Sequence, residues 1–316
     1  MPRLLVLGAG GFLGRSFADY VSSHGGAELI LHYRSTEERS AVGGSRESPI
    51  LDLVTCTSGA FAELVDDVAP DVVVNCTGLI RGWPDELRAA NVDVVVRLID
   101  ELDGRGGVHL VHFGSAAEYG PQPHRRPVAE TTFACPEGAY GITKLEATER
   151  LMQAASAGRI SATVLRLFNP IGRLSPPSTL PGNAARKIEE ALRTGAEAIN
   201  LGALDSWRDY IDVRDIARAV VAAAARIPQH GAVLNVGRGE AVGSMHLVKT
   251  LAAIAGYHGE IVEGDLHSDR SAHVDWQCAD VEAINTSLGW SAEYSIEDSL
   301  GDLWSGNSNS TDLANV

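Results

Sequence analysis

The chain has 316 residues, of which 45% are hydrophobic, enough to bury one large or two modest cores. Its 26 basic and 41 acidic residues give a net charge of −15, which disfavours nucleic acid as a partner. No apolar run approaches the length of a membrane span, and the N-terminal run stops at glycines too early for a signal peptide.

The cysteines and histidines indicate neither a metal site nor a disulfide framework. The four cysteines are far apart and form no CxxC pair, and the ten histidines show no ligand spacing. His109 and His112 are three residues apart in an expected strand, which places them on opposite faces. Reduced cysteines suit the cytoplasm, where we expect the protein to act.

Short apolar runs alternate with helical patterns from the first residues onward. The runs are continuous, as is typical of strands buried on both faces of a parallel sheet. We therefore expect an α/β fold, with a Rossmann-type doubly wound parallel sheet and a smaller, mixed C-terminal substrate-binding domain. The expected strands are residues 4–8, 28–33, 71–78, 108–115, 163–170 and 232–237.

The alternation stops near residue 170. There GRLSPPSTLPGN contains three prolines and two glycines, which cannot continue a strand or a helix. We assign residues 1–170 plus about 208–238 to the Rossmann domain, and about 171–207 plus 239–304 to the smaller domain. The polar segment 305–316 predicts a disordered tail.

The first expected strand runs into GAGGFLGRSF, where Gly8, Gly11 and Gly14 precede a helical pattern. Glycines at this spacing let the backbone turn tightly and approach a pyrophosphate at the N-terminus of the helix. The alternative is an ordinary turn in a chain with 33 glycines. The strand before the turn and the helix after it favour a dinucleotide site.

The second expected strand ends in LHYRS, with no Asp or Glu in residues 31–35. A carboxylate at this position binds the ribose 2′-hydroxyl of NAD, whereas a cation favours the 2′-phosphate of NADP. Arg34 therefore favours NADP(H) over NAD(H). The alternative is that Arg34 is a solvated loop arginine.

The stretch GSAAEYG, residues 114–120, lies at the carboxyl end of an expected strand, where open α/β sheets place their chemistry. Tyr140 follows Ser115 by 25 residues, and Lys144 lies one helical turn after Tyr140. An ammonium group near a phenol lowers its pKa from roughly 10, so the pair predicts a proton shuttle. The alternative is a chance pairing with a solvated lysine.

Together these motifs resemble the extended short-chain dehydrogenase/reductase family, which includes nucleotide-sugar epimerases, dehydratases and reductases. The resemblance covers nearly the whole chain and continues through RLFNPIG (166–172), WRDYIDVRDIARAV (207–220) and LNVGRGE (234–240). The second half is most similar to the branch of GDP-mannose 4,6-dehydratase and GDP-4-keto-6-deoxymannose reductase, through ARKIEEALRTG (185–195) and INLGALDSWRDYIDVRDIARA (199–219).

The resemblance implies that Ser115 donates a hydrogen bond to the reacting oxygen, that Tyr140 is the acid or base, and that Lys144 lowers the pKa of Tyr140. It also places Asp52 and Leu53 after a third strand, beside the adenine. The implied cofactor-binding residues are Gly8, Gly11, Phe12, Leu13, Gly14, Arg34, Asp52, Leu53, Cys76, Thr77, Asn91, Tyr140, Lys144 and Phe168.

The resemblance further implies a nucleotide-diphosphate sugar as substrate, bound by Asn169, Lys187, Arg208 and Arg270. Each has a simpler alternative. Lys187 and Arg208 could be surface cations, and Asn169 could only shape a turn. Arg270 stands in RSAH where the family has RPGD.

Ala116 and Ala117 occupy the positions where related 4,6-dehydratases carry an acid and a base, and a methyl group can do neither job. Glu118 is expected to point elsewhere. The cysteine and histidine with which GDP-fucose synthase inverts C3 and C5 have no match after Ser115. We therefore expect an NADPH-dependent 4-ketoreductase of a nucleotide-linked 4-keto-6-deoxyhexose, with Tyr140 as proton donor. The alternatives are an NAD-retaining 4-epimerase and a non-catalytic NADP(H)-sensing relative.

The helices near 85–103 and 137–157 correspond to those that form a four-helix dimer interface in relatives. The segment LRAANVDVVVRLIDEL carries apolar residues around much of its surface, so we expect a homodimer. The alternative is that the segment packs only on its own sheet.

Overall fold

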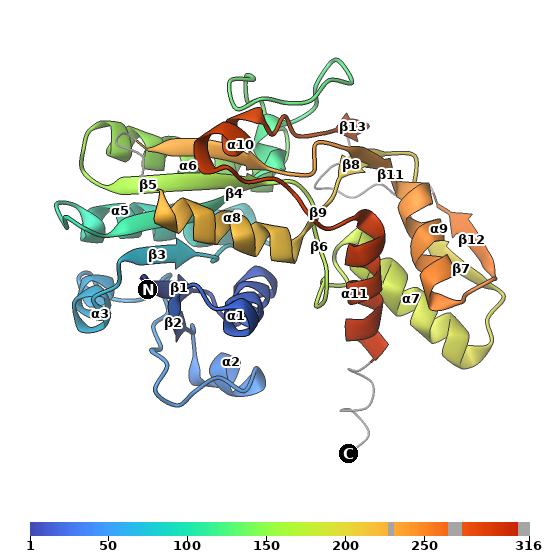
Figure 1. Cartoon of the computed structure of the whole chain (residues 1–316), viewed down its shortest axis with the longest axis horizontal. Helices are drawn as coiled ribbons and strands as arrows, with labels where there is room; N and C mark the ends of the chain where they lie inside the picture. Colours follow the sequence, from blue (N-terminus) through green and yellow to red (C-terminus); the bar gives the residue numbers. More distant parts are fainter. Residues whose placement is uncertain (227–230, 265–273, 309–316) are drawn as a thin grey trace.

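The computed structural model of the chain describes residues 1–226, 231–264 and 274–308. At its centre is a six-stranded parallel sheet in the order β10-β5-β4-β3-β1-β2, with helices on both faces (Figure 1). The strands coincide with the six apolar runs, which confirms the expected Rossmann-type sheet. They are β1 (Arg3–Leu7), β2 (Glu28–His32), β3 (Val72–Asn75), β4 (His109–Ser115), β5 (Ser161–Leu167) and β10 (Ala232–Val236).

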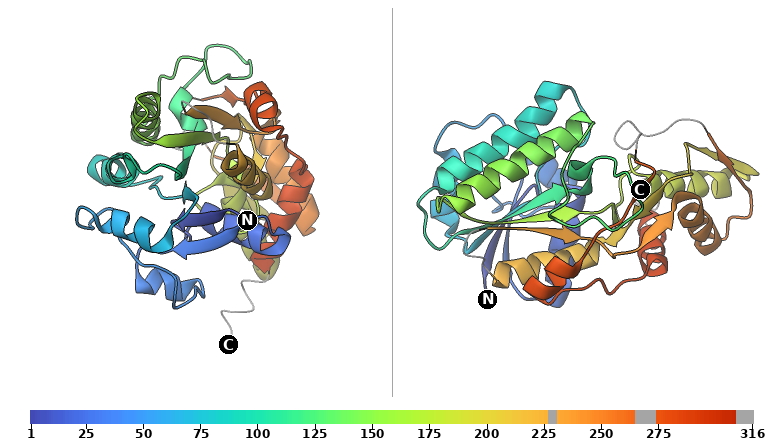
Figure 2. Two further views of the ribbon diagram at one scale, coloured as in Figure 1. Left: turned by 60° about the vertical axis from the view of Figure 1, so that its left-hand side comes forward. Right: turned by 90° about the horizontal axis from the view of Figure 1, so that it is seen from above.

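Both faces of the sheet are covered because successive side chains of each strand point to opposite sides. Leu4 and Val6 belong to one buried core, and Leu5 and Leu7 belong to the other. In Figure 2 the helices lie in two layers with the sheet between them. One layer contains α1 (Phe12–His24), α8 (Val213–Ala225) and α10 (Glu282–Leu288); the other contains α3 (Ala60–Val68), α5 (Val94–Leu102) and α6 (Ala139–Ser156).

The order of the strands reverses at β1, which lies between β2 and β3. Open α/β sheets bind their ligands outside the carboxyl ends of the strands at such a point. The loops after β1 and β3, and the turn after β4, meet at this edge.

Smaller elements form the part of the molecule drawn to the right of the sheet in Figure 1. Ile188, Leu247 and Leu300 share a separate core there. The strands form three small sheets, which contain β11 (Ala241–Gly243), β8 (Trp207–Asp209) and β13 (Trp276–Gln277); β12 (Glu260–Glu263) and β7 (Ala198–Leu201); and β6 (Pro170–Ile171) and β9 (Ile211–Asp212). The helices of this part are α7 (Leu180–Thr194), α9 (Ser244–Ala255) and α11 (Ile296–Ser308).

The proposed domain boundaries stay a prediction. Helix α10, which we assigned to the smaller domain, packs against α8 and β10 of the large sheet. Its Ile284 and Leu288 enter the core beneath that sheet.

The structure corrects three local expectations. Before Asp52 there is only an isolated bridge between Tyr33 and Ile50, because the preceding segment is rich in Gly, Ser and Pro. GRLSPPSTLPGN is irregular as far as Thr179, as expected, but its last four residues begin α7, because Pro181 lies in the first helical turn, where a missing N–H costs no hydrogen bond. The polar tail was expected from residue 305, but α11 continues to Ser308, and residues 309–316 lie outside the described part.

Across residues 1–226, 231–264 and 274–308, every helix is too short or too polar to cross a membrane.

Candidate active site

The turn between β1 and α1 is shaped to hold a pyrophosphate. Gly8 has a positive φ of 74°, and a side chain at Gly14 would come within 2.8 Å of the Cα atom of Ala9. These glycines therefore let the chain turn tightly and let α1 pack against the turn. A helix leaves the N–H groups of its first turn without partners inside the helix, and here they belong to Phe12, Leu13 and Gly14. Exposed Gly11 keeps this end open, so the residues fit a dinucleotide phosphate.

The end of β2 holds a carboxylate that sequence reasoning missed. The backbone N–H of exposed Arg34 donates to Glu38 Oε2 at 2.7 Å. Glu38 Oε1 lies 2.6 Å from the position that a Cβ atom would take at Gly10, so this carboxylate contacts the glycine turn. Glu38 belongs to α2 (Thr36–Ala41), which Ser35 caps. The signal for Glu38 in the sequence is the Ser-x-x-Glu spacing of a capping box, residues 35–38. It extends past residues 31–35, where we expected the group that binds the ribose.

The two residues predicted beside the adenine have structural roles of their own. Asp52 Oδ1 accepts the Val54 N–H at 3.0 Å and so shapes a turn. The Leu53 side chain is buried with Phe61 in the core. Asp52 therefore reaches the surface, whereas Leu53 offers a ligand little beyond its backbone.

The loop after β3 touches the glycine turn. A Cβ atom at Gly8 would lie 3.2 Å from Thr77 Cγ2, so Thr77 borders the pyrophosphate position. Thr77 donates through its N–H and its hydroxyl to Asn75 Oδ1, at 3.0 and 2.6 Å. Burial raises the pKa of the neighbouring Cys76 thiol, so it stays protonated. Both predicted residues thus lie beside the cradle.

Asn91, in the π-helical turn η1 (Ala89–Asp93), joins the loop after β3 to helix α6. Its side chain accepts the Leu79 N–H at 2.8 Å and donates to the Leu79 carbonyl at 2.9 Å and to Thr143 Oγ1 at 3.0 Å. Such turns are frequent at functional sites. The structure places Asn91 between the loop after β3 and helix α6, with its amide engaged by protein groups.

Ser115 ends β4 and begins the short 3-10 helix η2 (Ala116–Tyr119). Its N–H donates to Glu118 Oε1 at 2.7 Å, and its hydroxyl oxygen accepts the Ala117 N–H at 3.2 Å. Glu118 is fully buried and also accepts from Arg166 Nε at 2.7 Å. Burial raises the pKa of Glu118, and the Arg166 charge opposes this shift. The Glu118 carboxylate is thus engaged by protein groups.

Two glycines bring Tyr140 and α6 against this turn. A side chain at Gly141 would come within 2.5 Å of the Ala117 carbonyl oxygen, and one at Gly120 would collide with the backbone of Cys135. Helix α6 can therefore approach η2 as closely as its backbone allows. Tyr140 lies in the first turn of this helix, next to Gly141, which packs against the turn that follows Ser115.

Lys144 is buried one turn further along α6. Its ammonium donates to the Phe113 carbonyl and lies 3.4 Å from His112 Nε2. Burial lowers the pKa of Lys144 to about 8, and the Glu118 charge opposes this shift. Ser115, Tyr140 and Lys144 thus lie on contacting elements at one edge of the sheet, where together they can exchange a proton with a bound oxygen.

The residues predicted to bind substrate fall into different surroundings. Asn169 has a positive φ of 25° and donates to the Asp209 carbonyl at 2.8 Å, so it does shape a turn. Arg208, beside that carbonyl, is 7% exposed and donates to the Trp207 carbonyl at 2.9 Å. Lys187 donates to the Asn200 carbonyl and so joins α7 to β7.

Two further predicted residues need separate mention. Arg270 lies outside the described residues. Phe168, predicted to contact the cofactor, is completely buried against Tyr119, so its side chain has no surface for a ligand.

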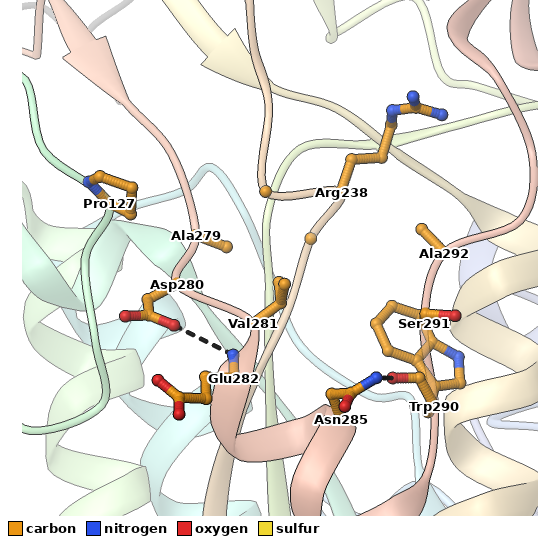
Figure 3. A pocket seen from close by; sticks show the side chains of 12 residues that line it. Pro127, Arg238, Ala279, Asp280, Val281, Glu282, Asn285, Trp290, Ser291 and Ala292 are labelled. Atoms are coloured by element: carbon orange, nitrogen blue, oxygen red, sulfur yellow. Dashed lines mark hydrogen bonds between the residues drawn. The ribbon is translucent and has the colours of Figure 1, made fainter.

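A separate pocket of about 500 Å³ lies beside the N-terminus of α10 (Figure 3). Two hydrogen bonds join residues of its lining: the Asp280 carboxylate accepts the Glu282 N–H, and Asn285 donates to the Trp290 carbonyl. None of the predicted site residues that the structure describes lines it. We therefore place the candidate site at the carboxyl ends of β1, β3 and β4.

The chain combines a parallel sheet, a glycine turn at the N-terminus of a helix, and a Tyr-Lys pair near a strand-end serine. This combination defines a dinucleotide-binding Rossmann protein of the short-chain dehydrogenase/reductase class. The family model described as "NAD dependent epimerase/dehydratase family" matches residues 4–237. The chain belongs to this family.

Two relatives are similar over nearly their whole length. A dTDP-6-deoxy-L-talose 4-dehydrogenase (NAD(P)(+)) of Kitasatospora kifunensis is 34% identical, over 97% of this chain and 96% of its own. A GDP-6-deoxy-D-mannose reductase of Pseudomonas aeruginosa is 27% identical, over 94% of each chain.

Solved structures share the fold. RMD from Pseudomonas aeruginosa, complexed with NADPH, has a TM-score of 0.82 at 23% identity and covers 98% of this chain and 100% of its own. The UDP-glucose-4-epimerase of Stenotrophomonas maltophila, with bound NAD, has a TM-score of 0.84 at 22% identity, over 99% and 100%.

Proposed function

We propose that the protein is an NADPH-dependent reductase that converts the 4-keto group of a nucleotide-linked 4-keto-6-deoxyhexose to an alcohol. The observation that carries the proposal is the arrangement of Tyr140 and Lys144 beside Ser115, with alanine at the next two positions. The 34% identical relative is named for the reverse reaction, oxidation at C4 of a dTDP-linked 6-deoxysugar. This supports a dTDP-linked substrate.

The side chains would act on the C4 oxygen. A reduced nicotinamide held at the glycine turn would supply the hydride. Tyr140 would donate its phenolic proton to the oxygen as negative charge develops there. Ser115 Oγ already accepts the Ala117 N–H, so its own O–H is available to donate to the same oxygen. The charge of Lys144 stabilises the tyrosinate that remains.

The surroundings of Ser115 support reduction over dehydration. Removal of water across C5 and C6 needs a further acid and base, but positions 116 and 117 carry methyl groups. Glu118, the nearest carboxylate in sequence, is engaged with Arg166 and the Ser115 N–H.

For substrate binding we propose Asn169, Arg208, Lys187 and Arg270 as contacts of the diphosphate or nucleoside. Arg208 and Asn169 are the better supported pair, because they lie together where β8 meets the end of β5. Arg208→Ala should lower kcat as well as raise KM, since remote binding energy helps orient the reacting carbon. Unchanged kinetics on the true substrate would refute the role of Arg208.

For the cofactor we propose NADPH, used in preference to NADH. Exposed Arg34 is placed to pair with a 2′-phosphate, whereas Glu38 against the glycine turn would repel that phosphate and suit a 2′-hydroxyl. Arg34→Ala should raise the KM for NADPH about tenfold or more and leave that for NADH nearly unchanged. Glu38→Gln should strengthen the preference for NADPH over NADH. If Arg34→Ala leaves the ratio of the two kcat/KM values unchanged, the role of Arg34 is wrong.

A second candidate is a nucleotide-sugar 4-epimerase that retains NAD. The position of Glu38 favours it, since an acidic group there suits NAD. Several 4-epimerases are also similar to the chain, among them a UDP-glucose 4-epimerase of Corynebacterium glutamicum at 27% identity.

The deciding experiment mixes the purified protein with NADPH or NADH and the 4-keto form of dTDP-6-deoxy-L-talose, with the GDP-linked 4-keto-6-deoxymannose alongside. Loss of reduced nicotinamide matched by a new C4 hydroxyl in the NMR spectrum supports the reductase. Purified protein that carries NAD and interconverts C4 epimers without consuming reduced cofactor supports the epimerase.

We further propose that the enzyme works in the cytoplasm as a homodimer.

A further inference from the structure

His112 lies beside the proposed catalytic groups but has no part in the mechanism above. It belongs to β4, where its register partner on β3 is Asn75. Its side chain is 1% exposed and faces the same side of the sheet as α6. On that side the ring lies between Asn75 and Lys144, each within 3.4 Å.

The hydrogen bonds of Asn75 determine which nitrogen of His112 carries the proton. Asn75 Oδ1 accepts the backbone N–H of Thr77, which can only donate, so the orientation of the amide is fixed. The other end of the amide, an NH2 group, lies 3.0 Å from His112 Nδ1. Since an NH2 group only donates, Nδ1 must accept and carries no proton.

The remaining nitrogen faces Lys144. Burial, with the charge of Lys144 as a second cause, holds the pKa of His112 well below its ordinary value, so the ring is neutral. A neutral ring without a proton on Nδ1 carries it on Nε2, which lies 3.4 Å from Lys144 Nζ. An N–H directed at an ammonium repels it, whereas an uncharged amine can accept from it.

Other charged groups face Lys144 from neighbouring elements. Glu118 of η2 attracts the ammonium, but Arg166 of β5 pairs with Glu118 and weakens that attraction. The Phe113 carbonyl accepts from the ammonium. His112 is thus the neighbour whose hydrogen-bond polarity opposes the charged form of Lys144.

We propose that His112, oriented by Asn75, is a positioning residue that directs an N–H at Lys144 and thereby, in addition to burial, shifts the pH range over which this lysine is charged to lower values. The consequence for catalysis rests on the proposed function, because there the charge of Lys144 stabilises the tyrosinate. Reduction should then decline on the alkaline side as Lys144 loses its proton. Asn75 and His112 connect the turn at Thr77, beside the glycine turn, to Lys144.

The chain offers a direct test that does not depend on activity. It contains three lysines, Lys144, Lys187 and Lys249, so protein labelled with ¹³C-lysine gives three side-chain signals. Lys187→Arg and Lys249→Arg variants assign them by elimination. In the wild type the Lys144 signal should titrate near pH 8.

His112→Phe removes the N–H, and the pKa of Lys144 should rise above about 8, while burial keeps it below its ordinary 10.5. His112→Gln keeps an acceptor for Asn75 and an N–H for Lys144. Lys144 should therefore titrate in this variant as it does in the wild type. His109→Phe is the matched control: His109 is equally buried on the same strand, but it faces the other side and bonds Ser161 and Thr163. A folded His112→Phe protein whose Lys144 pKa is unchanged or lower overturns the inference.

A second measurement needs no destabilising variant. In ¹⁵N-histidine-labelled wild type, the His112 signals, assigned by their loss in His112→Gln, should show the proton on Nε2. A proton on Nδ1 overturns the inference even if His112→Phe does not fold. If the keto sugars are not reduced at all, the proposed function fails while both titrations still decide the role of His112. If they are reduced, the alkaline limb of kcat should move to higher pH in His112→Phe but not in His109→Phe.

Discussion

Tyr140 carries the proton transfer in the proposed reaction, so its hydroxyl is the group whose loss should matter most. Tyr140→Phe should lower kcat by about 10²–10⁴-fold, because the C4 oxygen then lacks its general acid. The Kd for NADPH should stay within about threefold, since the glycine cradle is untouched. Stopped-flow turnover and fluorescence titration of NADPH measure the two quantities.

The matched control is Tyr257→Phe. Tyr257 is buried in the smaller core and donates to the Ala196 carbonyl at 3.4 Å, far along the chain from Ser115. This variant should keep wild-type kcat. A Tyr140→Phe enzyme with the turnover of this control would show that another group protonates the sugar.

The residues of the site differ in how far sequence alone could place them. Ser115, Tyr140 and Lys144 follow from a strand end and a helical spacing, which are local patterns. Glu38 could not be placed, because its contact with the glycine turn depends on how α2 folds back after β2. The burial of Phe168 against Tyr119 could not be placed either, because these residues are far apart in the chain.

The contact between α6 and η2 sets the position of Tyr140, and Gly141 makes that contact possible. Gly141→Ala would push the new methyl group to within 2.5 Å of the Ala117 carbonyl oxygen, which is backbone and cannot swing aside. We expect the start of α6 to shift and kcat to fall about tenfold or more even though Tyr140 is retained.

Gly301→Ala is the control for this element. Gly301 lies within helix α11, and a Cβ atom there would meet nothing within 4 Å. The control should therefore leave kcat unchanged and raise the free energy of unfolding by about 0.5–1 kcal/mol. Turnover and urea denaturation of both variants make the comparison. Equal turnover in the two variants would mean that the close approach of α6 is not needed.

The sequence predicted the elements of the large sheet better than those of the smaller part. The six long strands are apolar without interruption, because both of their faces are covered. Strands such as β11 and β13 have two or three residues, too few for a periodic pattern, and they form only because β8 lies beside them. The N-terminus of α7 was read as irregular, since its proline is tolerated only in the first helical turn.

Buried histidines make the stability of the whole molecule depend on pH. Burial lowers the pKa of His32 and of His109 from 6.5 to about 4, so the folded protein binds fewer protons than the unfolded chain between those values. The contribution of these histidines, and of His112, whose pKa burial also lowers, to the free energy of unfolding must then decrease as pH falls from 6.5 to 4. Buried Asp209, whose pKa is raised from 3.8 to about 6, opposes this trend with one proton.

Burial also raises the pKa of Glu118 and of Asp215, and both carboxyl groups oppose the trend as Asp209 does. Each buried histidine by itself contributes a loss of about 1.4 kcal/mol per pH unit. Urea denaturation at several pH values between 4.5 and 6.5 measures this slope. His109→Gln, an uncharged side chain that can still bond Ser161, should flatten it by about 1.4 kcal/mol per pH unit. Exposed His246→Gln should not. An unchanged slope in His109→Gln would show that His109 is not buried in its neutral form.

The homodimer stays a prediction. The apolar residues of the predicted interface helix, among them Val95, Leu98 and Ile99, are buried in the chain's own core. On the neighbouring helix α6, Glu146 forms ion pairs with Arg88 of α4 (Pro84–Arg88) and with Arg150. The simpler alternative thus accounts for the apolar pattern of this segment.

Sedimentation equilibrium decides the oligomeric state. If the helices α5 and α6 form the interface, the wild type sediments as a dimer at micromolar concentration. Val96→Arg, on the half-exposed side of α5, should then produce monomers, while Ile254→Arg on α9 should not. A wild-type monomer contradicts the prediction.

The sequence by itself determined the sheet, the glycine turn and the Ser115, Tyr140 and Lys144 set, because each of these depends on neighbours a few residues away or on the burial pattern of one strand. Only the tertiary structure decided what surrounds them. Asn75 meets His112, and Glu118 meets Arg166, through the register of strands far apart in the chain. No local pattern encodes that register, since it is the packing of both faces of the sheet that selects it.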